Sequence, residues 1–310
     1  MNNELKARLQ HRFENLLLDH ATVVENGEKG PFGVCITNKD PQNRHIFFKQ
    51  KKINERVLMS AFFLEILALG AIATTKGVTN ESLGVFAGIF DFNKTNDLLL
   101  DDLLEGSVKY ASGKSGFYKF KGESRCLDRQ LFESGIMAFF YEKEYEVKSD
   151  LAPVDNSFVL PEANCSRFPV KNGILKHPDL VCLDELTVSK EGLAWGVYQY
   201  PVHHFCNRGH FPGNPIMMGV LQLTCIEDLL LEWLLENEYK GEYILKGNAT
   251  IFKKSGVVVA QIKQFEIKGW VFVEGFLNQC EYQSIKKAIF KSSVIPNETL
   301  YINASFSCYN

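Results

Sequence analysis

The sequence predicts an α+β fold built from two similar halves. A long apolar segment at residues 57–75 is followed by several short extended segments, and the same order of helix and strands returns after a polar stretch. A helix followed by antiparallel strands is typical of α+β proteins. A chain of 310 residues is also long enough for two domains, each with its own core.

The first half begins with apolar residues at helical spacing, which predict a short amphipathic helix within residues 1–20 that caps the first domain. Residues 33–50 favour one or two strands, broken by a turn at 40–43. The apolar helix follows, and strands are then expected at 85–92, 103–111, 115–124 and 131–141.

A polar stretch that contains Pro153, Pro161 and Asn164 predicts a linker between the halves. We therefore expect a first domain at residues 1–150, a linker at 151–168 and a second domain at 169–310. Within the second domain the pattern predicts a helix at 219–235 and strands at 180–186, 193–200, 243–252, 257–267, 269–277 and 284–290.

Composition is that of a globular protein, with 45% hydrophobic and 23% charged residues. A net charge of −3 without a long basic run argues against nucleic-acid binding. The eight cysteines form no CxxC pair and no zinc-like cluster, which indicates reduced thiols in a cytoplasmic protein without a metal or cofactor. Residues 57–75 approach the length of a membrane span, but Glu65 in their middle argues against one.

One 13-residue stretch, Gly209-His-Phe-Pro-Gly-Asn-Pro-Ile-Met-Met-Gly-Val-Leu221, stands out in the second half. A histidine precedes a rigid turn of prolines and glycine, and a helix starts at Gly219. This arrangement predicts an imidazole fixed beside the positive end of a helix.

The two helices can be superimposed in sequence, because an offset of 159 residues places Lys51 on His210 and Gly88 on Gly247. Farther along, an offset of 153 places Gly116–Gly122 on Gly269–Gly275. These matches predict an internal repeat.

The stretch at 209–221 closely resembles the signature of the FabA/FabZ-type β-hydroxyacyl-acyl-carrier-protein dehydratases. The resemblance implies the hotdog fold, in which a curved antiparallel sheet wraps a central helix, over most of residues 165–292. The first half is similar to the same fold more loosely. Because members of this family pair as dimers, the chain is expected to be a double hotdog, with both partners of the dimer in one chain.

The family's site combines this histidine with a Glu or Asp 14 residues later in the helix, one from each subunit. In this chain the second half has Thr224 at the acid position, while the first half has Lys51 at the histidine position and Glu65 at the acid position. His210 and Glu65 are therefore the expected catalytic pair of a single site between the halves. The opposite site, with Lys51 and Thr224, is expected to be inactive.

The resemblance also gives roles to neighbouring residues. The N–H of Gly219 is expected to bind the thioester oxygen, and Phe211 and Pro215 to lie in the substrate-binding part of the site. Asp228, one helical turn after Thr224, is an alternative acid.

The implied reaction is the dehydration of β-hydroxyacyl thioesters to trans-2-enoyl thioesters in fatty acid or polyketide synthesis. The expected partner is an acyl carrier protein or an acyl-CoA substrate, and the pseudo-dimer could pair further into a homo-oligomer. A non-catalytic acyl-thioester-binding scaffold and a hotdog thioesterase remain as alternatives. A binder would have no need to keep His210 and Glu65 as a complementary pair.

Overall fold

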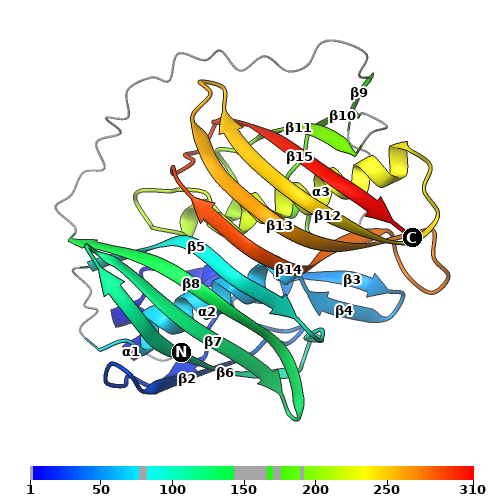
Figure 1. The fold of residues 1–310 in the computed structure, drawn as a ribbon. Helices are drawn as coiled ribbons and strands as arrows, with labels where there is room; N and C mark the ends of the chain where they lie inside the picture. Colours follow the sequence, from blue (N-terminus) through cyan, green and yellow to red (C-terminus); the bar gives the residue numbers. More distant parts are fainter. Residues whose placement is uncertain (1–2, 77–81, 143–165, 170–175, 189–191) are drawn as a thin grey trace.

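The structure, a computed structural model, describes residues 3–76, 82–142, 166–169, 176–188 and 192–310. Each half has one long helix against a curved antiparallel sheet (Figure 1), so the predicted α+β double hotdog is confirmed. The helices are α1 (Asn3–Arg8), α2 (Ser60–Thr74) and α3 (Gly219–Glu236), with short 3-10 helices η1 (Phe13–Asn15), η2 (Arg44–Phe47), η3 (Pro178–Leu180) and η4 (Phe205–Arg208). The strands of the first half are β1 (His20–Ala21), β2 (Lys29–Cys35), β3 (Phe48–Lys52), β4 (Glu55–Leu58), β5 (Ser82–Lys94), β6 (Leu103–Lys114), β7 (Phe117–Cys126) and β8 (Arg129–Glu142). Those of the second half are β9 (Ser166–Pro169), β10 (Glu185–Val188), β11 (Leu193–Gln199), β12 (Gly241–Lys253), β13 (Val258–Val271), β14 (Gln279–Phe290) and β15 (Thr299–Tyr309).

The two sheets join into one. The strand order is β1-β2-β6-β7-β8-β5-β14-β13-β12-β15-β11-β10-β9, and β3 and β4 form a separate hairpin. The junction lies between β5 and β14, where Ile89 pairs with Ala288 in antiparallel register. The halves are thus held together by backbone hydrogen bonds as well as by packed side chains (Figure 1).

Helix α2 lies at the centre of the molecule, which explains its composition. All 15 of its residues are buried, since it packs against β2, β5, β6 and β8 on one side and against α3 and β14 on the other. A helix that is apolar all round is stable only when its whole surface is covered. Glu65 is its one ionisable residue and is therefore buried with it.

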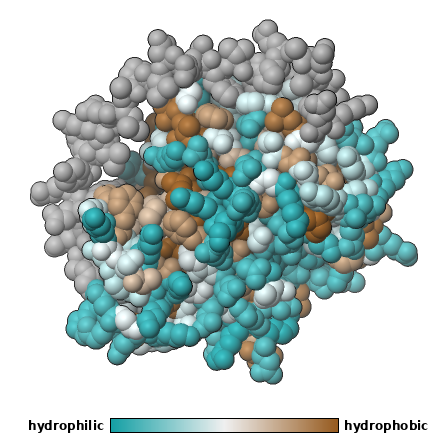
Figure 2. Space-filling view, in the orientation of Figure 1, coloured by the Kyte–Doolittle hydropathy of each residue, from teal (hydrophilic) through white to brown (hydrophobic). Residues whose placement is uncertain are grey.

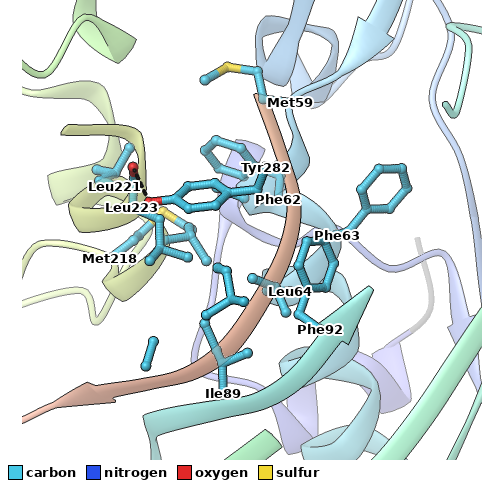
Figure 3. Packing of buried hydrophobic residues seen from close by; sticks show 14 of the residues in the cluster. Met59, Phe62, Phe63, Leu64, Ile89, Phe92, Met218, Leu221, Leu223 and Tyr282 are labelled. Atoms are coloured by element: carbon cyan, nitrogen blue, oxygen red, sulfur yellow. Dashed lines mark hydrogen bonds between the residues drawn. The ribbon is translucent and has the colours of Figure 1, made fainter. Parts of the chain in front are cut away.

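The interface between the helices is a continuous hydrophobic core (Figure 3). Phe62 and Phe63 from α2 and Leu223 from α3 have no exposed surface, so they belong to this core. The hydroxyl of Tyr282 on β14 donates to the backbone oxygen of Leu223 at 3.3 Å, the bond that is dashed in Figure 3. This packing fixes α2 and α3 relative to each other.

The strand predictions are wrong at several places in the second half. The segment expected as a strand at 180–186 is mostly the end of η3 and a loop, because β10 begins only at Glu185, and β9 was not expected. One strand, β13, covers most of the two segments expected at 257–267 and 269–277. In addition, β15 was not anticipated, although it alternates buried and exposed residues in the usual way for a half-buried strand. Its buried residues include Leu300, Ile302 and Ala304.

The halves have the same spatial arrangement but a different chain order. By position in the sheet β2, β6, β7, β8 and β5 correspond to β11, β15, β12, β13 and β14. In the first half, the first strand after α2 is β5, which lies at the junction. In the second half, the junction strand is β14, the third strand after α3. The C-terminal half is therefore a permuted copy.

A pair of hydrogen bonds supports this correspondence. The N–H of Leu58 donates to the backbone oxygen of Leu98 at 2.9 Å, just after β5. The N–H of Met217, at the offset of 159 from Leu58, donates to the backbone oxygen of Val294 at 2.8 Å, just after β14. The segment β5–β6 thus corresponds to β14–β15.

The predicted repeat is consequently correct up to the ends of α2 and α3 and wrong for the strands that follow them. Gly88 lies in β5 at the junction, whereas Gly247 lies in β12, away from it. The match of Gly116–Gly122 with Gly269–Gly275 fails for the same reason, since β7 corresponds to β12 and not to the end of β13. Sheet position depends on which strands pair, and that is not readable from a local glycine pattern.

The N-terminal segment also differs from the prediction. Helix α1 ends at Arg8, and the segment after it reaches the second half, where the N–H of Arg12 donates to the backbone oxygen of Gly209 at 2.9 Å. It therefore lies against the signature stretch instead of only capping the first domain.

The domain boundaries stay a prediction. The expected linker at 151–168 lies outside the described residues except for its last three, which begin β9. Figure 2 shows this face of the molecule as largely hydrophilic, with hydrophobic residues gathered near the residues drawn in grey. Within the described ranges, we find no helix with the length and hydrophobicity needed to cross a membrane.

Candidate active site

His210 is held in one orientation and one tautomer. It is only 6% exposed, and its Nδ1 lies 2.8 Å from the backbone oxygen of Ile216. Because a carbonyl oxygen can only accept, Nδ1 carries the proton and Nε2 keeps its lone pair. The backbone turns sharply after it, with φ of 59° at Phe211 and 88° at Gly213. The motif therefore presents a fixed basic nitrogen.

Glu65 approaches the same place from the first half. It lies in the second turn of α2 and is 3% exposed. His11, Glu65 and His210 each contribute one side-chain nitrogen or oxygen atom to a cluster, and these three atoms all lie within 4.8 Å of one another. The structure thus brings together the two residues that the sequence analysis paired.

His11 is the residue that the sequence analysis missed. Its Nε2 lies 3.6 Å from a carboxyl oxygen of Glu65, and its ring centroid lies 5.1 Å from that of His210 and 5.3 Å from that of Phe211. The local pattern gave no signal for it, because a single histidine in an amphipathic segment is common. Only the contact of the N-terminal segment with Gly209 brings it to the site.

Burial sets the protonation states of the three groups. It lowers the pKa of His210 to about 4, although the bond to the Ile216 oxygen opposes this. It raises the pKa of Glu65 to about 7. The pKa of His11 lies well below its ordinary value because of burial and then repulsion by His210 and Arg12. At neutral pH the site therefore holds two neutral imidazoles and a carboxyl group that is partly protonated.

Of the other predicted site residues, Phe211 contacts this cluster, and Pro215 and Gly219 follow His210 in the signature stretch. Phe211 contacts both imidazoles, with its ring centroid 4.3 Å from that of His210. Pro215 is half-buried in the turn. Gly219 is the first residue of α3, so its N–H has no acceptor within the helix. That N–H is the kind of group that can bind an oxyanion.

Asp228, the alternative acid, is engaged elsewhere. Its carboxylate forms an ion pair with Lys176 and accepts the N–H of Cys182 at 2.7 Å. It is absent from the cluster formed by the described residues His11, Glu65 and His210. The structure therefore does not bring Asp228 to His210.

At the opposite position, Thr224 and Lys51 stand where the family has its acid and its histidine. Thr224 is fully buried and its hydroxyl donates to the backbone oxygen of Val220 at 3.2 Å. Lys51 lies 2.7 Å from Glu281 and 2.8 Å from Asp97, with its ammonium 4.5 Å from the ring centroid of Trp270. An ionic cluster thus surrounds the position where the family has its histidine.

The pKa of Glu281 shows how firmly this cluster is fixed. Burial opposes the ionisation of Glu281, but Lys94, Lys49 and Lys51 more than offset it, and the pKa falls well below its usual range. The ammonium of Lys51 is therefore held by these carboxylates, and its contacts are those of a structural ion pair.

The three donor groups of the cluster are also of the type that hold a catalytic zinc ion, namely two histidines and a glutamate. Their present separation, up to 4.8 Å, is wider than the spacing of ligands around one such ion. A bound ion would have to draw them together. No step of the proposed reaction requires it.

Comparisons with known proteins give one sequence relative, from two strains, and several structural matches. No family model matches the chain. The 3-hydroxyacyl-[acyl-carrier-protein] dehydratase FabZ of two Caulobacter vibrioides strains is 26% identical over 144 residues, which is 45% of this chain and 87% of FabZ.

Among solved structures, the dehydratase domain of the CurK module of curacin polyketide synthase is 12% identical, with a TM-score of 0.45 over 89% of this chain and 98% of that domain. The H959F variant of the PpsC dehydratase domain from Mycobacterium tuberculosis is 10% identical, with a TM-score of 0.46 over 89% of this chain and 98% of that domain. The chain is thus similar in sequence to FabZ over 45% of its length, and its described helices and strands form a double hotdog.

Proposed function

We propose that the protein dehydrates β-hydroxyacyl thioesters to trans-2-enoyl thioesters at a single site between its halves. The observation that carries the proposal is the meeting of a neutral imidazole from the FabZ-like motif with a buried, protonatable carboxyl from the other half. Such a pair supplies the base and the acid that elimination of water requires.

In this mechanism His210 acts as the base and Glu65 as the acid. Nε2 of His210 takes the proton from the α-carbon, and the electrons of that C–H bond form the double bond between the α- and β-carbons. The C–O bond at the β-carbon breaks, and the leaving hydroxyl takes the proton of Glu65 and departs as water. Imidazolium and carboxylate remain and exchange a proton to reset the site.

The start of α3 stabilises the charge that builds up on the thioester oxygen. The N–H of Gly219 is free of the helix, and the helix dipole adds positive potential at the same point. A donor of this kind typically contributes about 2.7 to 4 kcal/mol to the transition state. Phe211 and Pro215 are proposed to line the substrate beside it.

We further propose that the acyl group is carried by an acyl carrier protein or by coenzyme A. This rests on the FabZ relative, whose name describes action on an acyl-carrier-protein substrate. A coenzyme A thioester and a carrier-protein thioester can be assayed in parallel. The thioester with the higher kcat/KM identifies the carrier.

The test is the reverse reaction, the hydration of a trans-2-enoyl thioester, followed by loss of the ultraviolet absorption of the conjugated double bond. His210→Ala and Glu65→Gln should each lower kcat by about 100- to 10,000-fold. His203→Ala, at an exposed histidine of the preceding turn, and Glu236→Gln, at the end of α3, serve as matched controls and should leave kcat unchanged.

The alternatives give different results in the same assay. Release of free thiol without hydration would indicate a thioesterase. Binding of the thioester without any turnover by the unaltered protein would contradict the proposal and favour an acyl-binding scaffold.

A further inference from the structure

His11 is a buried titratable group that the proposed mechanism does not use. We propose that His11 is a positioning residue of the site, which accepts the hydrogen bond of the Glu65 carboxyl and keeps this acid from bonding to His210. The inference rests on the proposed function. It assigns a role to the N-terminal segment, which precedes both hotdog sheets in the chain.

The segment that carries His11 is anchored just after this residue. The N–H of Arg12 donates to the backbone oxygen of Gly209 at 2.9 Å, and the side chain of Asn15 donates to the backbone oxygen of Cys206 at 3.3 Å. Glu14 accepts two hydrogen bonds from Arg208, at 2.6 and 3.0 Å. Each of these bonds joins the segment to the residues just before His210, so the backbone that carries His11 is fixed beside His210.

Gly209 permits this contact because it has no side chain. A Cβ at this position would lie 2.3 Å from the backbone oxygen of Arg12 and 2.3 Å from the side-chain nitrogen of Asn15. Such distances are far shorter than any real contact. The close approach of the segment therefore depends on the missing side chain of the first residue of the signature.

The protonated carboxyl of Glu65 needs an acceptor. The titratable groups near it are His11, His210 and the thiol of Cys206, and burial raises the pKa of that thiol well above its ordinary value. A hydrogen bond to Nε2 of His210 would occupy the lone pair that must take the α-proton. Nε2 of His11, 3.6 Å from the carboxyl, is an acceptor whose use leaves Nε2 of His210 free, and catalytic hydrogen bonds are often long before substrate binds.

The tautomer that this role requires leaves a donor free. If Nε2 of His11 accepts, its Nδ1 carries the proton, and this buried atom has no hydrogen-bond partner in the part of the chain that the structure describes. An unsatisfied buried donor carries a desolvation cost. A substrate oxygen or a water in the closed site would remove that cost.

The test compares two variants of His11. His11→Phe keeps a buried ring but has no acceptor, whereas His11→Gln places an amide oxygen near the position of Nε2. His11→Phe should lower kcat by about 10- to 100-fold, because the acid and the base are then wrongly oriented. KM should change little, because substrate binding is not affected. His11→Gln should recover most of the activity.

A second readout needs no substrate. Without His11, the Glu65 carboxyl bonds to His210 and favours its imidazolium, so the pKa of His210 should rise by about one unit or more. Imidazole NMR signals across a pH titration report this pKa directly. The groups acting on the cluster are His11, Glu65, His210, Cys206 and Arg12.

Controls separate this role from a purely structural one. His20→Phe, at an exposed histidine in β1, should change neither kcat nor the titration. Arg208→Ala removes a largely exposed side chain that anchors the buried Glu14, leaves His11 in place and should shift both readouts partway, which keeps the test valid if His11→Phe does not fold.

The inference is overturned if His11→Phe leaves both the titration of His210 and kcat unchanged, or if Phe and Gln lower kcat equally. The absence of turnover in the unaltered protein would contradict the proposed function alone, because the titration tests His11 without any turnover.

Discussion

The chemistry of single residues in the site follows from burial. His210 and Glu65 are buried to a similar degree, but burial moves their pKa values in opposite directions, because it disfavours the charged form of each. The base is thereby kept unprotonated and the acid protonated over the same range of pH. The same burial thus sets the protonation states of both groups.

The pH dependence of the reaction tests these assignments. His210 loses its base form as the pH falls below about 4, and Glu65 loses its acid form as the pH rises above about 7. We expect a bell-shaped profile of kcat/KM with limbs near these values. In Glu65→Gln the residual activity should lose the alkaline limb, and a limb that persists there would assign it to another group.

The stability of the protein should depend on Glu65 with a definite sign. Since its folded pKa is raised from 4.5 to about 7, the folded state is penalised as the pH rises through this window. Glu65→Gln should therefore be more stable than the unaltered protein at pH 8, by up to roughly 3 kcal/mol, and the gain should vanish near pH 4. Urea unfolding at the two pH values measures it, and an equal difference at both would contradict burial as the cause.

At the scale of elements, the N-terminal segment and the turn before α3 form one unit. Their contact depends on Gly209, where a side chain would collide with the backbone of Arg12. The segment therefore transmits any change at Gly209 to His11 and through it to Glu65.

Gly209→Ala should consequently lower both stability and kcat. Overpacking of this kind costs about 1 to 3 kcal/mol, and the displaced segment carries His11 away from Glu65. Gly275→Ala is a control for a glycine substitution without a collision, because a Cβ there would meet nothing within 4 Å; its φ is 79°, whereas that of Gly209 is −117°. The control should lose some stability and keep its kcat, as thermal unfolding and the hydration assay can show.

At the scale of the whole molecule, the permuted second half still builds the same pseudo-dimer. The junction of β5 with β14 and the packing of α2 on α3 bring Glu65 to His210 within one chain. In the proposed mechanism, one half therefore supplies the base and the other half the acid of a single site.

Mixing experiments test this intrachain arrangement. A mixture of His210→Ala and Glu65→Gln proteins should show no more activity than either alone, because each chain lacks one member of its own site. Recovery of about one quarter or more of the activity after joint unfolding and refolding would instead indicate that sites form between chains.

Much of the site could be predicted because it depends on local spacing. Once the family motif is aligned, the 14-residue interval that ends at Glu65 identifies a carboxyl that lies within 4.8 Å of a ring nitrogen of His210, and Thr224 stands at the corresponding position of the second helix. The apolar character of residues 57–75 similarly predicted a fully buried helix, and α2 confirms it.

The sequence by itself determined the α+β class, the two halves and the pairing of His210 with Glu65, since helical periodicity and motif spacing are local properties of the chain. The tertiary structure alone decided the rest. The position of His11, the ion pairs of Lys51 and the permuted order of β12 to β15 each depend on contacts between residues far apart in sequence. Such contacts arise from strand pairing and packing, which no local pattern encodes.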